Sequence, residues 1–165
     1  MAEQSANQTY SINVLMEQAR MLAANYRKTT GKTLAGVSGE LAVYDGIRLL
    51  NLQAVDDNLS YNAIGTEDAG DLENDRIQIK GRTIFSDSKG SPRIGQIKVS
   101  EDWDSVVLVL MNDNYDPYEM YGIDRASLED NSESKDSKKG KRGAMTVARF
   151  KKIATLVWSS EWVNS

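Results

Sequence analysis

Two short segments in the middle of the chain combine residue types that could support hydrolytic chemistry. They are YNAIG at 61–65 and RIQIKGR at 76–82, and fifteen residues separate Asn62 from Gln78. Alternate residues of an extended strand share a face, so Gln78 and Lys80 should project together while the intervening isoleucines point into the core. The polar side of this strand comprises Arg76, Gln78, Lys80 and Arg82.

The composition narrows the chemistry that these residues could perform. The chain contains neither histidine nor cysteine, which excludes the usual serine triads, thiol nucleophiles, imidazole metal sites and thiolate zinc sites. Catalysis would therefore depend on carboxylates, amides, lysine and a hard divalent cation.

The order of these residues resembles the PD-(D/E)XK nuclease superfamily, in the Mrr-like variant whose last motif reads Q-x-K. Glu40 in SGELAVYDG resembles the acid on a helix, Asn62 occupies the aspartate position, and Gln78 and Lys80 match the Q-x-K motif. The resemblance extends from about Glu40 to Tyr121, because WDSVVLVLMNDNYDPYEMYG is similar to the later core strands of small bacterial members.

The resemblance implies a DNA endonuclease of the restriction or defence type that uses Mg²⁺ or Mn²⁺. Glu40, residue 62 and Gln78 would hold the metal, which polarises the phosphoryl group and lowers the pKa of a water molecule, while Lys80 would serve the nucleophile. Asn62 departs from this pattern, because its amide oxygen can ligate Mg²⁺ but carries no negative charge. Metal binding and cleavage should therefore be weakened, unless acids of the following turn compensate: Glu67, Asp68, Asp71, Glu73 or Asp75.

The elements that would position these residues begin with two helices. Apolar residues recur at spacings of three and four from Ile12 to Tyr26, which predicts an amphipathic helix that ends near Gly31. A second helix is expected from about Ser38 to Leu50, with Glu40 in its first turn.

Further along the chain the apolar period changes from three and four to two. Four strands are expected, at Tyr61–Ile64, Arg76–Phe85, Ser105–Met111 and Tyr118–Ile123. A further short strand is expected at Ile94–Val99. Thr146 should cap a last helix that continues to Val157. The resemblance implies an α/β fold with a restriction-endonuclease-like core, a central mixed β-sheet flanked by helices, in the order two helices, four or five strands and a helix.

Charge is distributed unevenly, although the net charge is −4. The window from Glu133 to Lys152 carries eight basic and two acidic residues, so its charge is +6 and that of the remainder is −10. A mobile basic loop is expected at 130–143, because this segment is rich in Ser, Lys, Asp and Gly. The residues expected to contact nucleic acid are Arg76, Arg82, Lys138, Lys139, Lys141 and Arg142.

Length and hydropathy predict one domain at 11–165 preceded by a flexible N-terminus at 1–10. No segment approaches the roughly 18 apolar residues of a membrane span, and the first residues do not resemble a signal peptide. We therefore expect a cytoplasmic protein without a membrane partner. Its oligomeric state cannot be inferred from the residues, although many nucleases of this superfamily act as dimers.

Structural explanations compete with each functional interpretation. Gln78 and Lys80 could form a solvated strand face, Glu40 could stabilise the positive end of its helix, and the basic window could be a solvated loop. Trp103 and Trp158 are expected to pack in the core or at a helix end rather than stack on bases. Two other functions remain open: a catalytically silent module that binds nucleic acid or protein, and a small inhibitor or immunity-like protein.

Overall fold

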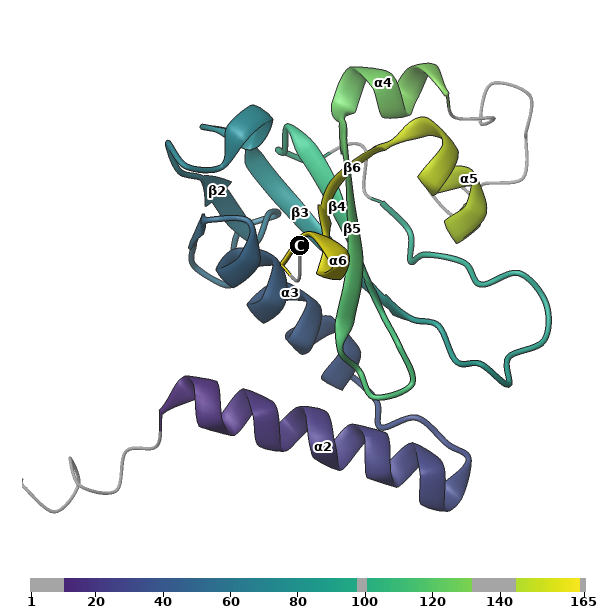
Figure 1. Cartoon of the computed structure of the whole chain (residues 1–165). Coiled ribbons are helices and arrows are strands. Elements are labelled where there is room, and N and C mark those ends of the chain that lie inside the picture. The colour runs from purple at the N-terminus through teal and green to yellow at the C-terminus, as the bar shows by residue number, and fades with distance from the viewer. Residues whose placement is uncertain (1–10, 98–100, 132–144, 164–165) are drawn as a thin grey trace, which may run out of the picture.

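The computed structural model describes residues 11–97, 101–131 and 145–163 (Figure 1). The chain forms an α/β structure in which helices flank a six-stranded mixed sheet. Its helices are α2 Ile12–Thr30, α3 Val37–Leu49, α4 Arg125–Asp130, α5 Val147–Ile153, α6 Ser160–Val163 and the 3₁₀ turn η1 Gly70–Leu72. Its strands are β1 Leu52–Ala54, β2 Ala63–Gly65, β3 Arg76–Thr83, β4 Ser105–Met111, β5 Pro117–Asp124 and β6 Thr155–Ser159.

The strands follow one another in space in their chain order, from β1 to β6. Only β3 and β4 run parallel, and every other neighbouring pair is antiparallel. A parallel pair cannot be joined by a tight hairpin, so the chain between β3 and β4 must cross a face of the sheet. All seven residues of β4 are buried, as a continuous apolar run in a central strand predicts.

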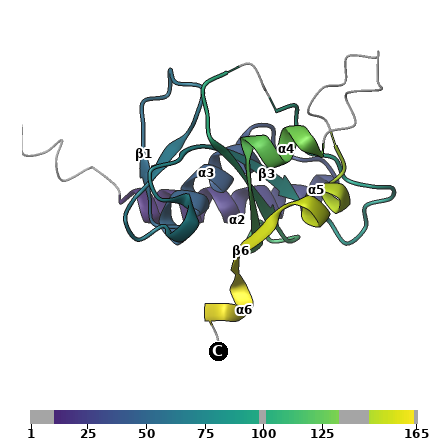
Figure 2. The same cartoon turned by 90° about the horizontal axis from the view of Figure 1, so that it is seen from above.

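Alternation along β4 divides the core between two faces of the sheet. Val107, Val109 and Met111 pack with residues of α2 and α3, whereas Val106, Leu108 and Leu110 pack with residues of α4 and α5. Accordingly, α2 and α3 lie on one side of the sheet and α4 and α5 on the other (Figures 1 and 2). This layering decides which residues of β3 can meet which helix.

The two expected leading helices and the expected central strands are confirmed, with small changes at their ends. Helix α2 continues to Thr30, where Gly31 in the left-handed conformation ends it, with φ of 74°. The structure also contains β1, α4 and α6, which the residue pattern did not predict. Asp130, expected to open the mobile loop, is instead the last residue of α4.

The prediction of a last helix reaching Val157 was wrong. Thr146 does cap α5, accepting a hydrogen bond from the backbone N–H of Arg149 at 3.1 Å. The helix stops at Ile153, however, and Thr155–Ser159 pairs with β5 as an antiparallel edge strand. Trp158 therefore lies on a strand, and Figure 2 shows β6 and α6 at the border of the molecule. The edge of β5 has backbone N–H and C=O groups that pair with Thr155–Ser159. The spacing of apolar residues carries no information about such a strand edge, so it predicted a helix.

The short strand expected at Ile94–Val99 is also absent from the described part of that segment. Arg93 forms an isolated bridge with Thr146, while Ile94 and Ile97 are buried in the core beside α5. Ile94 and Ile97 lie in the chain that crosses from β3 to β4. Their side chains are buried there without pairing in the sheet. Trp103, 1% exposed, is a core residue as expected.

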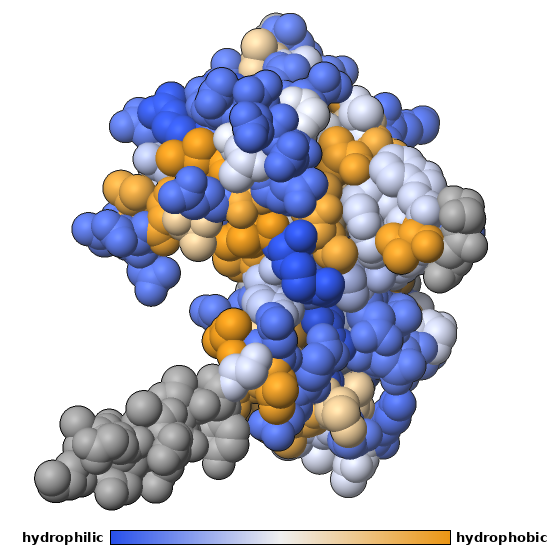
Figure 3. Space-filling view, turned by 60° about the vertical axis from the view of Figure 1, so that its left-hand side comes forward, coloured by the Kyte–Doolittle hydropathy of each residue, from blue (hydrophilic) through white to orange (hydrophobic). Residues whose placement is uncertain are grey.

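Helix α2 is covered on one side only. Its exposed apolar residues are Ile12, Val14, Leu15, Met21 and Leu22. Apolar atoms are visible on the lower part of the surface in Figure 3, where α2 lies. In the described part of the chain, none of the helices combines the length and apolarity that a membrane span requires.

Candidate functional site

Strand β3 presents the Q-x-K motif on the face of the sheet that is turned away from α3. A side chain built at Gly81 would meet the Cβ atom of Ala42 in α3 at 2.4 Å, and Ile79 lies beside Gly46 of the same helix. Alternation therefore directs Gln78 and Lys80 to the opposite face. In the parallel register these two residues lie beside Val106 and Leu108 of β4, which belong to that second core.

Asn62 lies directly beside this motif. Its backbone N–H donates to the carbonyl oxygen of Ile77 at 2.8 Å, and its side-chain Oδ1 accepts from the backbone N–H of Ile79 at 2.7 Å. The amide thereby continues the ladder between β2 and β3 beyond the end of the regular pairing. Asn62, Gln78 and Lys80 are thus brought together, as their spacing indicated.

Gln78 has an unusual environment for an amide side chain. It is only 6% exposed, and its Oε1 atom has no hydrogen-bond partner among the described residues. A buried acceptor without a donor destabilises a fold by about 1–3 kcal/mol. Most buried polar atoms are paired, so the amide oxygen of Gln78 is an exception that lies at a motif position.

Glu40 is not part of the same cluster. It is exposed in the first turn of α3, the helix that packs on the other face of the sheet. The helix layer that carries Glu40 is thus separated from the face that carries Gln78 and Lys80. A carboxylate in the first turn stabilises the positive end of a helix, and this position suits that role.

The two arginines of the polar strand face differ in their surroundings. Arg76 forms an ion pair with Asp104, in which Nε and one terminal nitrogen lie 3.0 and 3.1 Å from the carboxylate oxygens. Hydrogen bonds from the Arg76 side chain and backbone lower the pKa of Asp104. Asp104 was missed from the sequence, because it lies 28 positions after Arg76 and only the pairing of β3 with β4 brings the two residues together.

Arg82 is exposed at the end of β3, so its charge reaches solvent. The remaining residues expected to bind nucleic acid are Lys138, Lys139, Lys141 and Arg142, and they lie outside the described residues.

The donors around Gln78 do not form a site that suits Mg²⁺. Asn62 already uses its amide oxygen for the N–H of Ile79, Glu40 lies in the other layer, and Lys80 brings a positive charge. Mg²⁺ in proteins is normally held by one or two carboxylates and water. No group of three Asp, Glu, His or Cys residues that could hold a metal occurs among the residues that the structure describes.

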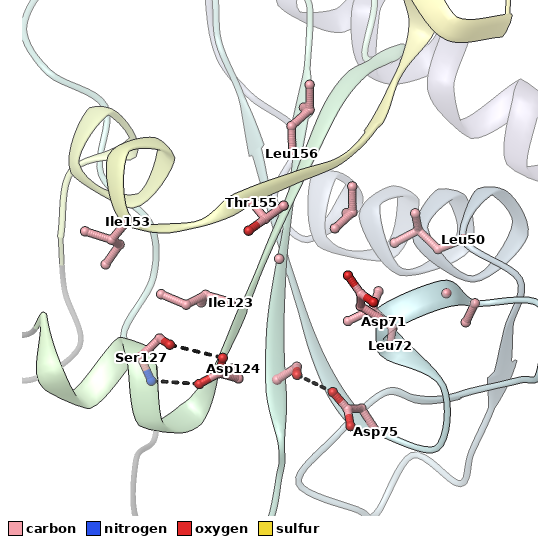
Figure 4. Close-up of a pocket in the computed structure, with 15 residues that line it drawn as sticks. Leu50, Asp71, Leu72, Asp75, Ile123, Asp124, Ser127, Ile153, Thr155 and Leu156 are labelled. Carbon is pink, nitrogen blue, oxygen red and sulfur yellow. Dashed lines mark hydrogen bonds between the residues drawn. The ribbon is translucent and has the colours of Figure 1, made fainter.

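A separate cavity of about 400 Å³ lies where β3 and β4 begin and β5 ends (Figure 4). Asp71, Asp75 and Asp124 line it, and the last two have structural partners. Asp75 accepts a hydrogen bond from the Ser105 hydroxyl at 2.6 Å. Asp124 caps α4 by accepting from the backbone N–H of Ser127 at 2.7 Å, which lowers the pKa of Asp124. Asp75 was one of the turn acids considered as an extra metal ligand, and its carboxylate already accepts this hydrogen bond from Ser105.

A scan against protein-family models found no match for this chain, and a search of the curated proteins found no significant match either.

Proposed function

We propose that this protein is a nucleic-acid-binding member of the restriction-endonuclease-like fold that engages DNA backbone through β3. In this proposal Asn62 leaves the site without the charge needed for metal-dependent cleavage. The observation that supports it is that Asn62 lies beside β3, bonded to Ile79, while Gln78 and Lys80 share one face of that strand. The α/β architecture with a mixed sheet is compatible with the fold that the PD-(D/E)XK resemblance implies.

The charge of the cluster favours a phosphate over a metal ion. Asn62 and Gln78 are neutral amides, Lys80 is a cation, and exposed Arg82 lies two residues further along the strand. Lysine and arginine contribute to DNA affinity by neutralising phosphates and releasing counterions. Because the whole chain carries −4, binding should be confined to this face and should be sensitive to salt.

DNA binding tests this proposal directly. Fluorescence anisotropy with a labelled 20-base-pair duplex should show binding by the wild type at low salt, and Lys80→Gln should weaken it severalfold. The slope of log K against log salt should fall by about 0.9 for the lost phosphate contact. Lys28→Gln is the matched control, since Lys28 is exposed on α2 in the other layer. No binding by the wild type, or an equal loss in both variants, contradicts the proposal.

A metal-dependent endonuclease is the second candidate, and the unpartnered Oε1 of Gln78 favours it. Calorimetric titration of Mn²⁺ and Mg²⁺ into wild-type protein and Asn62→Asp separates the two functions, with plasmid nicking measured on the same samples. We expect no measurable binding by the wild type at millimolar metal and a gain in Asn62→Asp, because the variant supplies the missing charge. Saturable binding and nicking by the wild type would show that the protein is an active nuclease.

A further inference from the structure

Helix α2 exposes more large apolar side chains than any other element that the structure describes. Eight such side chains are exposed among the described residues, and five of them lie on α2: Ile12, Val14, Leu15, Met21 and Leu22. The helix packs on the core through a different side, where Arg20, Ala23 and Ala24 are buried. Single exposed apolar side chains are ordinary, but their concentration in one place marks an interaction site.

The exposed side of α2 also repeats with the period of a helix pair. Its apolar positions are separated by three, four, three and four residues, and we call them the heptad stripe: Ile12, Leu15, Ala19, Leu22 and Tyr26. Three of these side chains are exposed, and Ala19 and Tyr26 are partly exposed. Alternating spacings of three and four form the a and d positions along which two helices pack side by side. The charged residues of α2 fall at other positions, so the heptad stripe fits an apolar helix.

The heptad stripe is self-complementary when a second copy of α2 lies antiparallel to it. With the two helices aligned close to their midpoints, Ala19 lies opposite the partner's Leu22, and Leu15 lies opposite the partner's Tyr26. Each smaller side chain then faces a larger one, and the twofold axis repeats both contacts. In a parallel pair Ala19 would face the partner's Ala19, which leaves a gap and loses packing contacts.

The polar edge of the heptad stripe agrees with this arrangement. Gln18 and Asn25 are exposed, and each lies one position before a residue of the stripe. In the antiparallel pair Gln18 lies near the partner's Asn25, where the two amides can exchange hydrogen bonds. The opposed directions of the two helix dipoles also favour antiparallel contact. Because these flanking residues are neutral, association should be almost independent of salt, in contrast to the proposed DNA binding.

We propose that two copies of this protein associate through the heptad stripe of α2, as an antiparallel helix pair with twofold symmetry. The proposal does not rest on DNA binding by β3. Helix α2 has 19 residues and is thus about 28 Å long. A contact of this length lies at the small end of specific interfaces, so we expect a reversible dimer with a dissociation constant of about 10–100 µM.

Sedimentation equilibrium of the whole chain tests this association, at concentrations from tenfold below to tenfold above the expected dissociation constant. We expect the mean mass to rise from that of a monomer toward that of a dimer, at low and high salt alike. The mass of a monomer across the whole range would overturn the proposal, whatever DNA binding shows.

Leu22→Gln and Met21→Gln form a matched pair of variants, because the two side chains are neighbours with similar exposure, 58% and 64%. Only Leu22 belongs to the heptad stripe, and each dimer buries two copies of it. Leu22→Gln should therefore weaken association about tenfold or more, whereas Met21→Gln should dimerise as the wild type does. Circular dichroism should show both variants folded, since both side chains are exposed. Equal dissociation constants for the two variants would overturn the assignment to the heptad stripe.

Cysteine cross-linking determines the direction of the pair, since the chain has no cysteine of its own. Tyr26 lies 11 positions after Leu15. In the antiparallel pair the two copies of residue 15 are thus about 16 Å apart along the axis, too far for a disulfide. Leu15→Cys alone should resist cross-linking under mild oxidation, whereas a mixture of Leu15→Cys and Tyr26→Cys should form a linked dimer. Rapid cross-linking of Leu15→Cys alone would overturn the antiparallel arrangement.

Discussion

Replacing Asp45 by alanine should lower the free energy of unfolding by about 3–5 kcal/mol, because it leaves a buried arginine without its partner. Asp45 is fully buried in α3, and its two oxygens accept hydrogen bonds from the terminal nitrogens of Arg20 at 2.8 and 2.9 Å. Arg20 is 4% exposed and also donates to the carbonyl oxygen of Tyr115. The ion pair thus joins α2, α3 and the turn between β4 and β5.

The electrostatics of Arg20 explain the size of this effect. Burial by itself lowers the pKa of its guanidinium, but hydrogen bonds to Asp45 and Glu17 outweigh burial and raise it. An arginine does not lose its proton at neutral pH, so Arg20 stays charged when Asp45 is removed. Its acidic neighbours among the described residues are then Glu17 and, at 3.8 Å, Asp116. Both of those carboxylates are more than half exposed, so solvent screens them.

Thermal unfolding followed by circular dichroism measures the change, and we expect a melting temperature lower by about 6–20 °C. Arg48→Gln is the control, because Arg48 contacts the same carboxylate at 3.0 Å but its side chain is 45% exposed. That variant should differ from the wild type by less than about 1 kcal/mol. The double variant Arg20→Met, Asp45→Leu should recover most of the loss. If Asp45→Ala melts within 2 °C of the wild type, the ion pair is not buried as described.

Replacing Gly65 by alanine should be similarly destabilising, by about 3 kcal/mol or more, because there is no room for a methyl group. A Cβ atom at Gly65 would lie 1.8 Å from the backbone oxygen of Leu72 and 2.6 Å from its carbonyl carbon. The obstruction is backbone, so no side-chain rotation can relieve it. The turn that contains Leu72 would have to move away from β2.

That turn is held to Gly65 by its own backbone. The N–H of Gly65 donates to the carbonyl of Asp75 at 3.0 Å, and its carbonyl accepts from the N–H of Asn74 at 2.9 Å. Moving the turn would break these hydrogen bonds and open the cavity of Figure 4, which Leu72 lines. Urea unfolding should therefore show a lower midpoint, and amide hydrogen exchange should accelerate at 66–75 before the rest of the sheet.

Gly95→Ala is the matched control for this change. Gly95 is exposed, and a Cβ atom there would have no atom of the described residues within 4 Å. Its stability should stay within about 0.5 kcal/mol of the wild type, as for most surface substitutions. Equal stability of Gly65→Ala and the wild type would contradict the close packing of this turn.

Part of the candidate site could be predicted from local pattern. Gln78 and Lys80 share a face because the period of a strand is two, which is a property of the backbone and needs no knowledge of the fold. The position of Asn62 beside them also agreed with expectation, since β2 precedes β3 and the two strands pair antiparallel. What the spacing could not show was that the amide oxygen of Asn62 would be used by the backbone of Ile79.

The placement of Glu40 depended on the tertiary structure alone. Its position in the first turn of a helix followed from the apolar spacing, but the face of the sheet against which that helix packs did not. Small residues decide which face of the sheet α3 covers, because Gly46 and Gly81 let α3 approach β3 on the side of Ile79. The sequence also could not predict that the side-chain oxygens of Gln78 and Thr83 are buried without a partner among the described residues, since hydrogen bonding depends on neighbours that are distant in sequence.

The sequence by itself determined an α/β chain with two leading helices, a buried central strand and a polar strand carrying Gln78 and Lys80. These features depend on composition and on periods of two and 3.6, which are local. Tertiary structure decided the edge strand β6, the crossover that buries Ile94 and Ile97, and the layer in which Glu40 lies. The physical reason is that a free strand edge and an uncovered sheet face select their partners by hydrogen bonding and burial, whatever the partner's own local preference.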